Sequence, residues 1–117
     1  SMEKARERWE RCIQIDPNHT AARHNLATIT AELGDIETAT RMVQELVRTA
    51  SPPDPDNYKT LAILLFKQDL HEESVEQYRR CIELDSTHGD CYCGMGNSLI
   101  KIGRTAEALD AYTRAVN

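Results

Sequence analysis

The feature that most constrains this chain is an internal repeat of about 34 residues. The segment Arg11–Pro17 (RCIQIDP) returns 69 residues later as Arg80–Ser86 (RCIELDS), and Glu45–Ser51 is a weaker copy between them. A second pair keeps the same register, because Glu32–Asp35 (ELGD) also lies 69 residues before Lys101–Arg104 (KIGR). A period of this length is typical of stacked structural units that bury their apolar faces only against neighbouring units.

Each period divides into two helical segments. In the second repeat, apolar residues recur at helical spacing at Ala22, Leu26, Ala27, Ile29 and Leu33, and again at Ile36, Ala39, Val43, Leu46 and Val47. Between them, Gly34 can end one helix and Asp35 can cap the next. The same alternation returns at 58–66 and 75–84, and at 92–102 and 106–116. No segment alternates with period two, so we predict an all-α fold.

Turn residues mark the boundaries between the repeats. Asp16–Asn18 contains a proline that ends the first helix, and Ser51–Asp56 contains three prolines and a candidate N-cap, Asp54. The pattern resumes in phase after one added residue, so we interpret this segment as a stiff turn. We predict a lone second helix at 3–19, repeats at 20–54 and 55–88, and a C-terminally truncated repeat at 89–117. Ser1 before Met2 is interpreted as the remnant of a cleaved tag.

These residues resemble the tetratricopeptide repeat, a 34-residue pair of antiparallel helices called A and B. The last repeat matches the family pattern at Tyr92, Met95, Gly96, Leu99, Ala108, Tyr112 and Ala115. The preceding repeat offers Tyr58, Leu61, Ala62, Leu65, Ser74, Tyr78 and Cys81, and the opening helix offers Ala5, Trp9, Cys12 and Pro17. The second repeat departs from the pattern, since Arg23 stands in place of the early aromatic residue. The resemblance implies a right-handed α-solenoid of about three and a half repeats with seven helices.

Composition excludes several classes of partner. The net charge of −5 is opposite in sign to that expected for general binding to nucleic acid or to anionic membranes. No run reaches the roughly 18 apolar residues that a membrane-spanning helix needs, and the charged N-terminus does not resemble a signal peptide. We therefore expect no nucleic acid, no membrane and a cytoplasmic location, with the nucleus as the alternative.

The four cysteines are expected to be unpaired packing residues. Cys12 and Cys81 occupy the same repeat position, where the family places a small apolar residue. His88, Cys91 and Cys93 form an H-x-x-C-x-C cluster, but residues two apart on a helix point about 200° away from each other. Cys91 and Cys93 thus cannot face one ion, and we predict neither a metal site nor any other cofactor. Unpaired cysteines on helices favour a reducing compartment.

Catalytic motifs are also missing from the sequence. There is no nucleophile elbow, phosphate loop or metalloprotease helix motif, and the four histidines have no motif partners. Gly94–Gly96 is a fragment of a glycine motif within a helix, which indicates close helix packing. We expect these residues to be non-catalytic, which leaves open what the rest of a longer protein would do.

The family resemblance implies a peptide-binding groove lined mainly by the A helices. Carried over by repeat position, the groove residues are His24, Asn25, Thr28, Lys59, Ile63, Phe66, Lys67, Asn97 and Lys101, with Glu32, Cys93 and Ile100 beside them. A carboxylate clamp would need basic residues where this chain has Asp90 and Gly94, or Asp56 and Thr60 in the alternative frame. An asparagine ladder would be matched at Asn25 alone. What remains is an apolar patch flanked by lysines, and simple solvation of the helices by these lysines is the competing interpretation.

Together these observations favour a protein-interaction scaffold or adaptor that binds a protein or peptide segment. Two alternatives stay open. The chain could be the substrate-recruiting segment of a larger enzyme, or it could self-associate as a homodimer through the edges of the broken repeats, where Trp9, Cys12 and Ile13 lack a partner helix.

Overall fold

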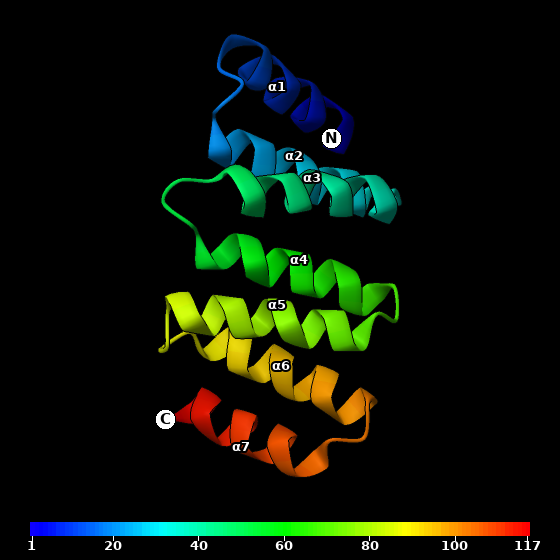
Figure 1. Cartoon of the computed structure of the whole chain (residues 1–117). Coiled ribbons are helices and arrows are strands. Elements are labelled where there is room, and N and C mark those ends of the chain that lie inside the picture. The colour runs from blue at the N-terminus through cyan, green and yellow to red at the C-terminus, as the bar shows by residue number, and fades with distance from the viewer. The chain divides into compact units, whose positions relative to one another are not determined.

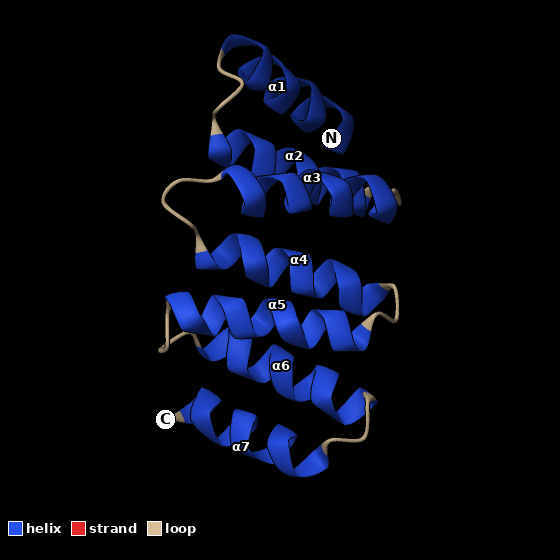
Figure 2. Cartoon of the chain, in the orientation of Figure 1, coloured by secondary structure: helices blue, strands red, loops and turns tan.

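The computed structural model describes all residues, Ser1–Asn117, and contains seven helices and no strand. The helices are α1 (Met2–Ile15), α2 (Thr20–Glu32), α3 (Ile36–Thr49), α4 (Pro55–Lys67), α5 (His71–Leu84), α6 (Gly89–Lys101) and α7 (Thr105–Val116). Short loops connect them (Figure 2). The all-α prediction with seven helices is confirmed. The chain forms two compact units, Ser1–Ser51 and Pro52–Asn117 (Figure 1).

The first unit contains α1, α2 and α3. Its core consists of Ala22 and Ala27 from α2 with Ala39, Val43 and Leu46 from α3, all of them almost completely shielded from solvent. Three of these five residues are alanines, which lets the backbones of α2 and α3 approach closely. Helix α1 packs on α2 but contributes no buried residue.

The second unit contains α4 to α7 and has two apolar clusters. One consists of Ala62, Tyr78, Cys81 and Cys91, and the other of Val75, Leu99, Ala108 and Ala111. Ser74 and Ser98 lie fully buried between the helices, and the Ser74 hydroxyl lies 2.8 Å from the Ala62 carbonyl oxygen and 3.1 Å from the Ser98 hydroxyl. This pairing satisfies groups that would be costly to bury alone.

The turn inside each repeat has the same backbone conformation. Gly34, Asp69 and Gly103 all have positive φ, at 102°, 62° and 80°. Glycine adopts this region without strain, and aspartate is among the other residues that tolerate it. The three turns therefore follow one geometry although the middle repeat has no glycine there.

A disulfide joins Cys81 of α5 to Cys91 of α6, with their Cα atoms 6.5 Å apart. The expectation that all four cysteines are unpaired was wrong for this pair, whereas Cys12 and Cys93 are free. Cys81 does pack in the core as predicted. The pairing arises because the end of one B helix contacts the start of the next A helix, a proximity that the spacing of ten residues does not reveal. None of the helices combines the length and apolarity needed to cross a membrane.

Candidate protein-binding surfaces

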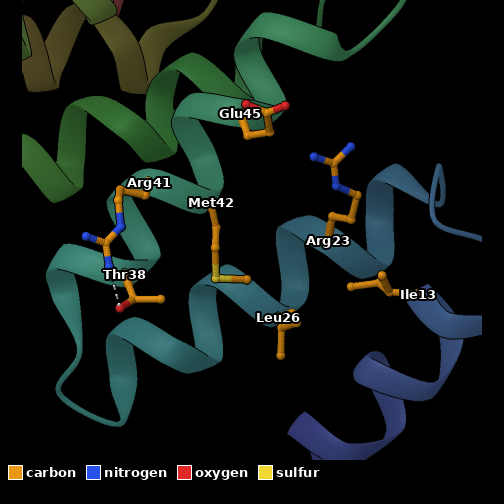
Figure 3. Close-up of a pocket in the computed structure, with 7 residues that line it drawn as sticks. All are labelled: Ile13, Arg23, Leu26, Thr38, Arg41, Met42 and Glu45. Atoms are coloured by element: carbon orange, nitrogen blue, oxygen red, sulfur yellow. Dashed lines mark hydrogen bonds between the residues drawn. The ribbon is translucent and has the colours of Figure 1, made fainter.

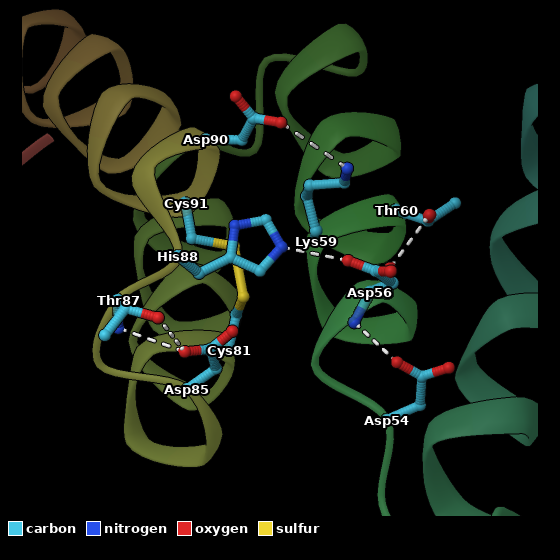
Figure 4. Close-up of polar contacts among 10 residues, drawn as sticks. All are labelled: Asp54, Asp56, Lys59, Thr60, Cys81, Asp85, Thr87, His88, Asp90 and Cys91. Atoms are coloured by element: carbon cyan, nitrogen blue, oxygen red, sulfur yellow. Dashed lines mark hydrogen bonds and ion pairs between the residues drawn. A yellow bond between two sulfur atoms is a disulfide. The ribbon is translucent and has the colours of Figure 1, made fainter.

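Helices α4 and α6 share a face that carries six of the predicted groove residues. Lys59, Ile63, Phe66 and Lys67 recur at helical spacing on α4, and Asn97 and Lys101 do so on α6. The Lys59 ammonium lies 3.9 Å from the Asp90 carboxylate, and this contact links the two helices at the N-terminal end of α6 (Figure 4). We call this region the α4–α6 face.

The centre of the α4–α6 face is apolar and its far end is basic. Ile63 and Ile100 remain 38% and 48% exposed, which leaves apolar surface open to a partner. Phe66 is half-buried, with its ring edge against His71 at a centroid distance of 4.7 Å. Lys67 and Lys101 are exposed in the last turns of α4 and α6.

Two tyrosines from the B helices support this face from behind. The Tyr112 hydroxyl donates a hydrogen bond to the Asn97 side-chain oxygen, so Asn97 is already partly engaged. The Tyr78 ring lies against Gly94, where a Cβ atom would overlap it. Burial, aided by the negative charges of Asp90 and Cys93, raises the pKa of Tyr78 to about 12. Its hydroxyl is therefore neutral at physiological pH.

The other three predicted groove residues lie in the first unit. His24, Asn25 and Thr28 are all half-buried on α2. The Thr28 hydroxyl donates to the His24 carbonyl oxygen of its own helix at 3.1 Å, so one of its hydrogen-bonding capacities is used internally. These residues share one side of α2, as the spacing from 24 to 28 requires.

The first unit also contains a hollow of about 410 Å³ that the sequence did not predict. Its lining comes from α1, α2 and α3 and consists of Ile13, Arg23, Leu26, Thr38, Arg41, Met42 and Glu45 (Figure 3). Figure 3 shows the Met42 and Leu26 side chains in the middle of the group, with Arg41 on one side and Arg23 and Ile13 on the other. Arg23 occupies the repeat position of Tyr58 and Tyr92. The missing aromatic ring was the only available sequence signal for an unfilled space here. We call it the α1–α3 hollow.

The charged side chains at the α1–α3 hollow leave it cationic. The Arg23 guanidinium donates a hydrogen bond to the Thr49 hydroxyl at 3.4 Å, and the Arg41 guanidinium donates one to the Thr38 hydroxyl at 3.3 Å. Arg23 also interacts electrostatically with Glu45, and Arg41 with Asp35. Glu45 is bound by Arg48, and this hydrogen bond is the main cause that lowers the pKa of Glu45. With two arginines and one glutamate, the lining carries a net positive charge.

Two further hollows lie in the second unit beside its B helices. The hollows there are lined largely by charged side chains from α5 and α7, including Glu72, Glu76 and Arg79. Arg79 lies 3.6 Å from Glu107, so an ion pair joins α5 to α7. Each of these two hollows carries two carboxylates, whereas the α1–α3 hollow carries one.

Two of the repeats match a model of a known protein family. The family model described as tetratricopeptide repeat matches residues 56–88 and 89–117, more than half of the chain. The chain belongs to the tetratricopeptide repeat family. Repeats of this family are in general non-catalytic modules for protein interaction. No curated protein sequence matches the chain.

Solved structures agree with this fold. One is titled "Crystal structure of MamA", with 19% identity, a TM-score of 0.87, and coverage of 98% of this chain and 67% of that one. Another is MamA 41-end from Desulfovibrio magneticus RS-1, with 16% identity, a TM-score of 0.85, and coverage of 98% and 64%. At this identity the likeness establishes the fold. The chain spans about two thirds of the length of these structures.

Proposed function

We propose that this chain is a protein-binding module that recognises segments combining large apolar side chains with carboxylates. The observation that carries the proposal is the exposed apolar strip Ile63 and Ile100 next to Lys67 and Lys101. A protein with a net charge of −5 places cations beside its open apolar surface. Apolar burial would supply affinity, and the lysines would favour acidic over basic segments.

The α1–α3 hollow supports the same preference. Its floor of Ile13, Leu26 and Met42 suits one large apolar side chain, and Arg23 and Arg41 suit a carboxylate beside it. Guanidinium groups can bind a carboxylate through two parallel hydrogen bonds, which makes arginine more selective than lysine for this group. The two surfaces are distinct candidates for the same ligand chemistry.

A peptide-selection experiment tests this proposal. A random peptide library displayed on phage is selected on the purified chain, and the enriched peptides are synthesised for fluorescence anisotropy. We expect enrichment in large apolar residues with Asp or Glu nearby. Replacement of those acids by Asn or Gln should weaken binding about tenfold, the equivalent of roughly 1.4 kcal/mol. Enrichment of basic peptides, or no effect of the amide replacements, would contradict the proposal.

Charge-reversal variants then assign the surface. Lys67→Glu combined with Lys101→Glu should weaken the binding of peptides that use the α4–α6 face. Arg41→Glu should weaken the binding of peptides that use the α1–α3 hollow. Lys4→Glu changes the net charge in the same direction at an exposed site of α1 and serves as the matched control. If none of the first three substitutions weakens binding beyond the control, neither surface is the site.

Self-association is a second candidate, favoured by exposed apolar residues on α7. Leu109 and Val116 remain 61% and 84% exposed and lie seven positions apart, on one side of the helix. Analytical ultracentrifugation over a range of concentrations would test this. A dimer that Leu109→Glu dissociates supports the candidate, and a monomer at every concentration excludes it.

A further inference from the structure

Three metal-ligating side chains meet where α5 ends and α6 begins. Cys81, His88 and Cys91 each offer one donor atom, and these atoms all lie within 4.8 Å of one another. From the sequence, we considered His88 and Cys91 only with Cys93, and we predicted no metal site because Cys91 and Cys93 point apart. Cys93 is indeed exposed, whereas Cys91 is buried beside Cys81 of the preceding helix. The convergence of two sulfurs and one imidazole is the kind of donor set that zinc prefers.

We propose that, when its disulfide is reduced, the Cys81–His88–Cys91 cluster is a binding site for Zn²⁺ or a similar thiophilic divalent ion. Tetrahedral zinc with bonds of about 2.3 Å to sulfur and about 2.0–2.1 Å to nitrogen holds its donors roughly 3.5–3.8 Å apart. In the oxidised chain the three donor atoms lie within 4.8 Å of one another. Once the disulfide is reduced, the two sulfurs must move apart to about 3.8 Å, which side-chain rotations can supply. Three protein ligands leave the fourth position to a water molecule.

His88 is oriented for this role by a carboxylate on a different helix. Its Nε2 atom lies 2.9 Å from an Asp56 carboxylate oxygen (Figure 4). Because a carboxylate accepts a hydrogen bond, the neutral imidazole carries its proton on Nε2, and its Nδ1 lone pair is available. Histidines that bind metal commonly donate their other ring N–H to a carboxylate in this way. Figure 4 shows the ring between Asp56 on one side and the two sulfurs on the other.

The turn before His88 is also held in place. The Asp85 carboxylate accepts hydrogen bonds from the Thr87 backbone N–H at 3.0 Å and from the Thr87 hydroxyl at 2.6 Å. These bonds lower the pKa of Asp85, so the turn keeps its hydrogen bonds at neutral pH. A fixed turn places the imidazole without the entropy cost of ordering a loose loop.

The surroundings of the sulfurs favour a metal with charge +2. Cys81 and Cys91 are completely buried, next to Ala62 and the neutral phenol of Tyr78. Two thiolates with no counter-ion would be expensive in this apolar environment, whereas two thiolates with one divalent cation are electrically neutral. Sulfur and imidazole donors select zinc over magnesium and calcium, which prefer oxygen ligands.

The disulfide and the metal complex exclude each other, because both use the same two sulfur atoms. A phosphine reductant with one water molecule cleaves the S–S bond and gives two thiols and a phosphine oxide. Binding of Zn²⁺ then forms two Zn–S bonds and releases the two thiol protons to solvent. The site is therefore accessible in the reduced chain and closed in the oxidised chain.

Cobalt titration of the whole chain tests the proposal, because tetrahedral Co²⁺ with thiolate ligands has intense visible and near-ultraviolet bands. The chain is reduced with a phosphine, freed of metal with a chelator and titrated with Co²⁺, and Zn²⁺ is added to displace it. We expect one equivalent of Co²⁺ per chain, bleaching by Zn²⁺, and no bands in the oxidised chain. Absence of these bands in the reduced, folded chain would overturn the proposal.

Matched cysteine variants separate this site from adventitious binding. Cys81→Ser should abolish the thiolate bands, while Cys12→Ser and Cys93→Ser should leave them unchanged, since neither residue belongs to the cluster. Asp56→Asn removes no ligand, and it should weaken Co²⁺ affinity about 10- to 100-fold through loss of the carboxylate behind His88. Circular dichroism confirms that each variant is folded. Bands that survive Cys81→Ser but disappear in Cys93→Ser would place the metal elsewhere and refute the assignment.

Discussion

Tyr78 is the residue whose chemistry the fold changes most. It is buried in the cluster formed with Ala62, Cys81 and Cys91, and its ring occupies the space that Gly94 leaves by having no side chain. Its position matched the aromatic of the family pattern, so its burial followed from the sequence. The contact with Gly94 did not, because it depends on which turn of α6 faces α5.

The raised pKa of Tyr78 predicts a loss of stability in alkaline solution. Its value of about 12 in the folded chain exceeds the ordinary value of 10.0 in the unfolded chain. Below pH 10 both states hold the proton and the stabilisation is complete; it declines above pH 10 and is lost as the pH passes through 12. Urea unfolding by rapid mixing between pH 9 and 12 should show this decline, and Tyr78→Phe should flatten it.

A spectroscopic titration gives an independent check. Tyrosinate absorbs at longer ultraviolet wavelengths than tyrosine, so the difference between the wild-type chain and Tyr78→Phe isolates the Tyr78 component. That component should have its midpoint near pH 12. A midpoint near the ordinary value would mean that the phenol is accessible to water.

The cysteines show the limit of residue-level prediction. Helical spacing correctly predicted that Cys91 and Cys93 point to different sides of the helix, since Cys91 is buried and Cys93 is exposed. The proximity of Cys81 to Cys91 arises from packing between helices of two successive repeats. A periodic pattern identifies the buried side of each helix, but it does not specify which buried side chains touch.

At the scale of elements, the ends of the helices were the most predictable feature. Asp54 caps α4 by accepting a hydrogen bond from the Asp56 backbone N–H at 2.9 Å, and Pro55 begins the helix, as the turn residues predicted. Asp69 adopts the positive-φ conformation that glycine has in the other two turns.

Loss of the α4 cap should have a measurable cost. Asp54→Ala removes the acceptor for one backbone N–H and should lower the free energy of unfolding by about 1 kcal/mol. Asp54→Asn keeps a capping oxygen and is the matched control, with a much smaller expected change. Chemical denaturation followed by circular dichroism measures both variants. Equal effects of the two substitutions would show that the carboxylate charge, rather than the cap, is what matters.

At the scale of the whole molecule, the repeat period was enough to predict the fold class. The α1–α3 hollow could not be predicted from the sequence, because an open space results from side chains that are absent. The departure at Arg23 identified the irregular repeat without revealing the shape that follows from it. The assignment of His24, Asn25, Thr28, Lys59, Ile63, Phe66, Lys67, Asn97 and Lys101 to binding stays a prediction.

Reduction of the disulfide should affect the two units unequally. A cross-link that closes a loop of ten residues stabilises the folded state by about 2–3 kcal/mol, because it restricts the unfolded chain. In the presence of reductant and a metal chelator, amide hydrogen exchange should quicken in α5 and α6 and stay unchanged in α2 and α3. An equal loss of protection in Ser1–Ser51 would show that the units unfold together.

The same cross-link changes how the chain would respond to tension. Cys81 belongs to the B helix of one repeat and Cys91 to the A helix of the next, so the bond spans the junction between repeats. A pulled, oxidised chain would extend everywhere except across these ten positions, which shortens its stretched length by roughly 30 Å. Oxidation therefore turns one junction of an extensible array into a fixed mechanical link.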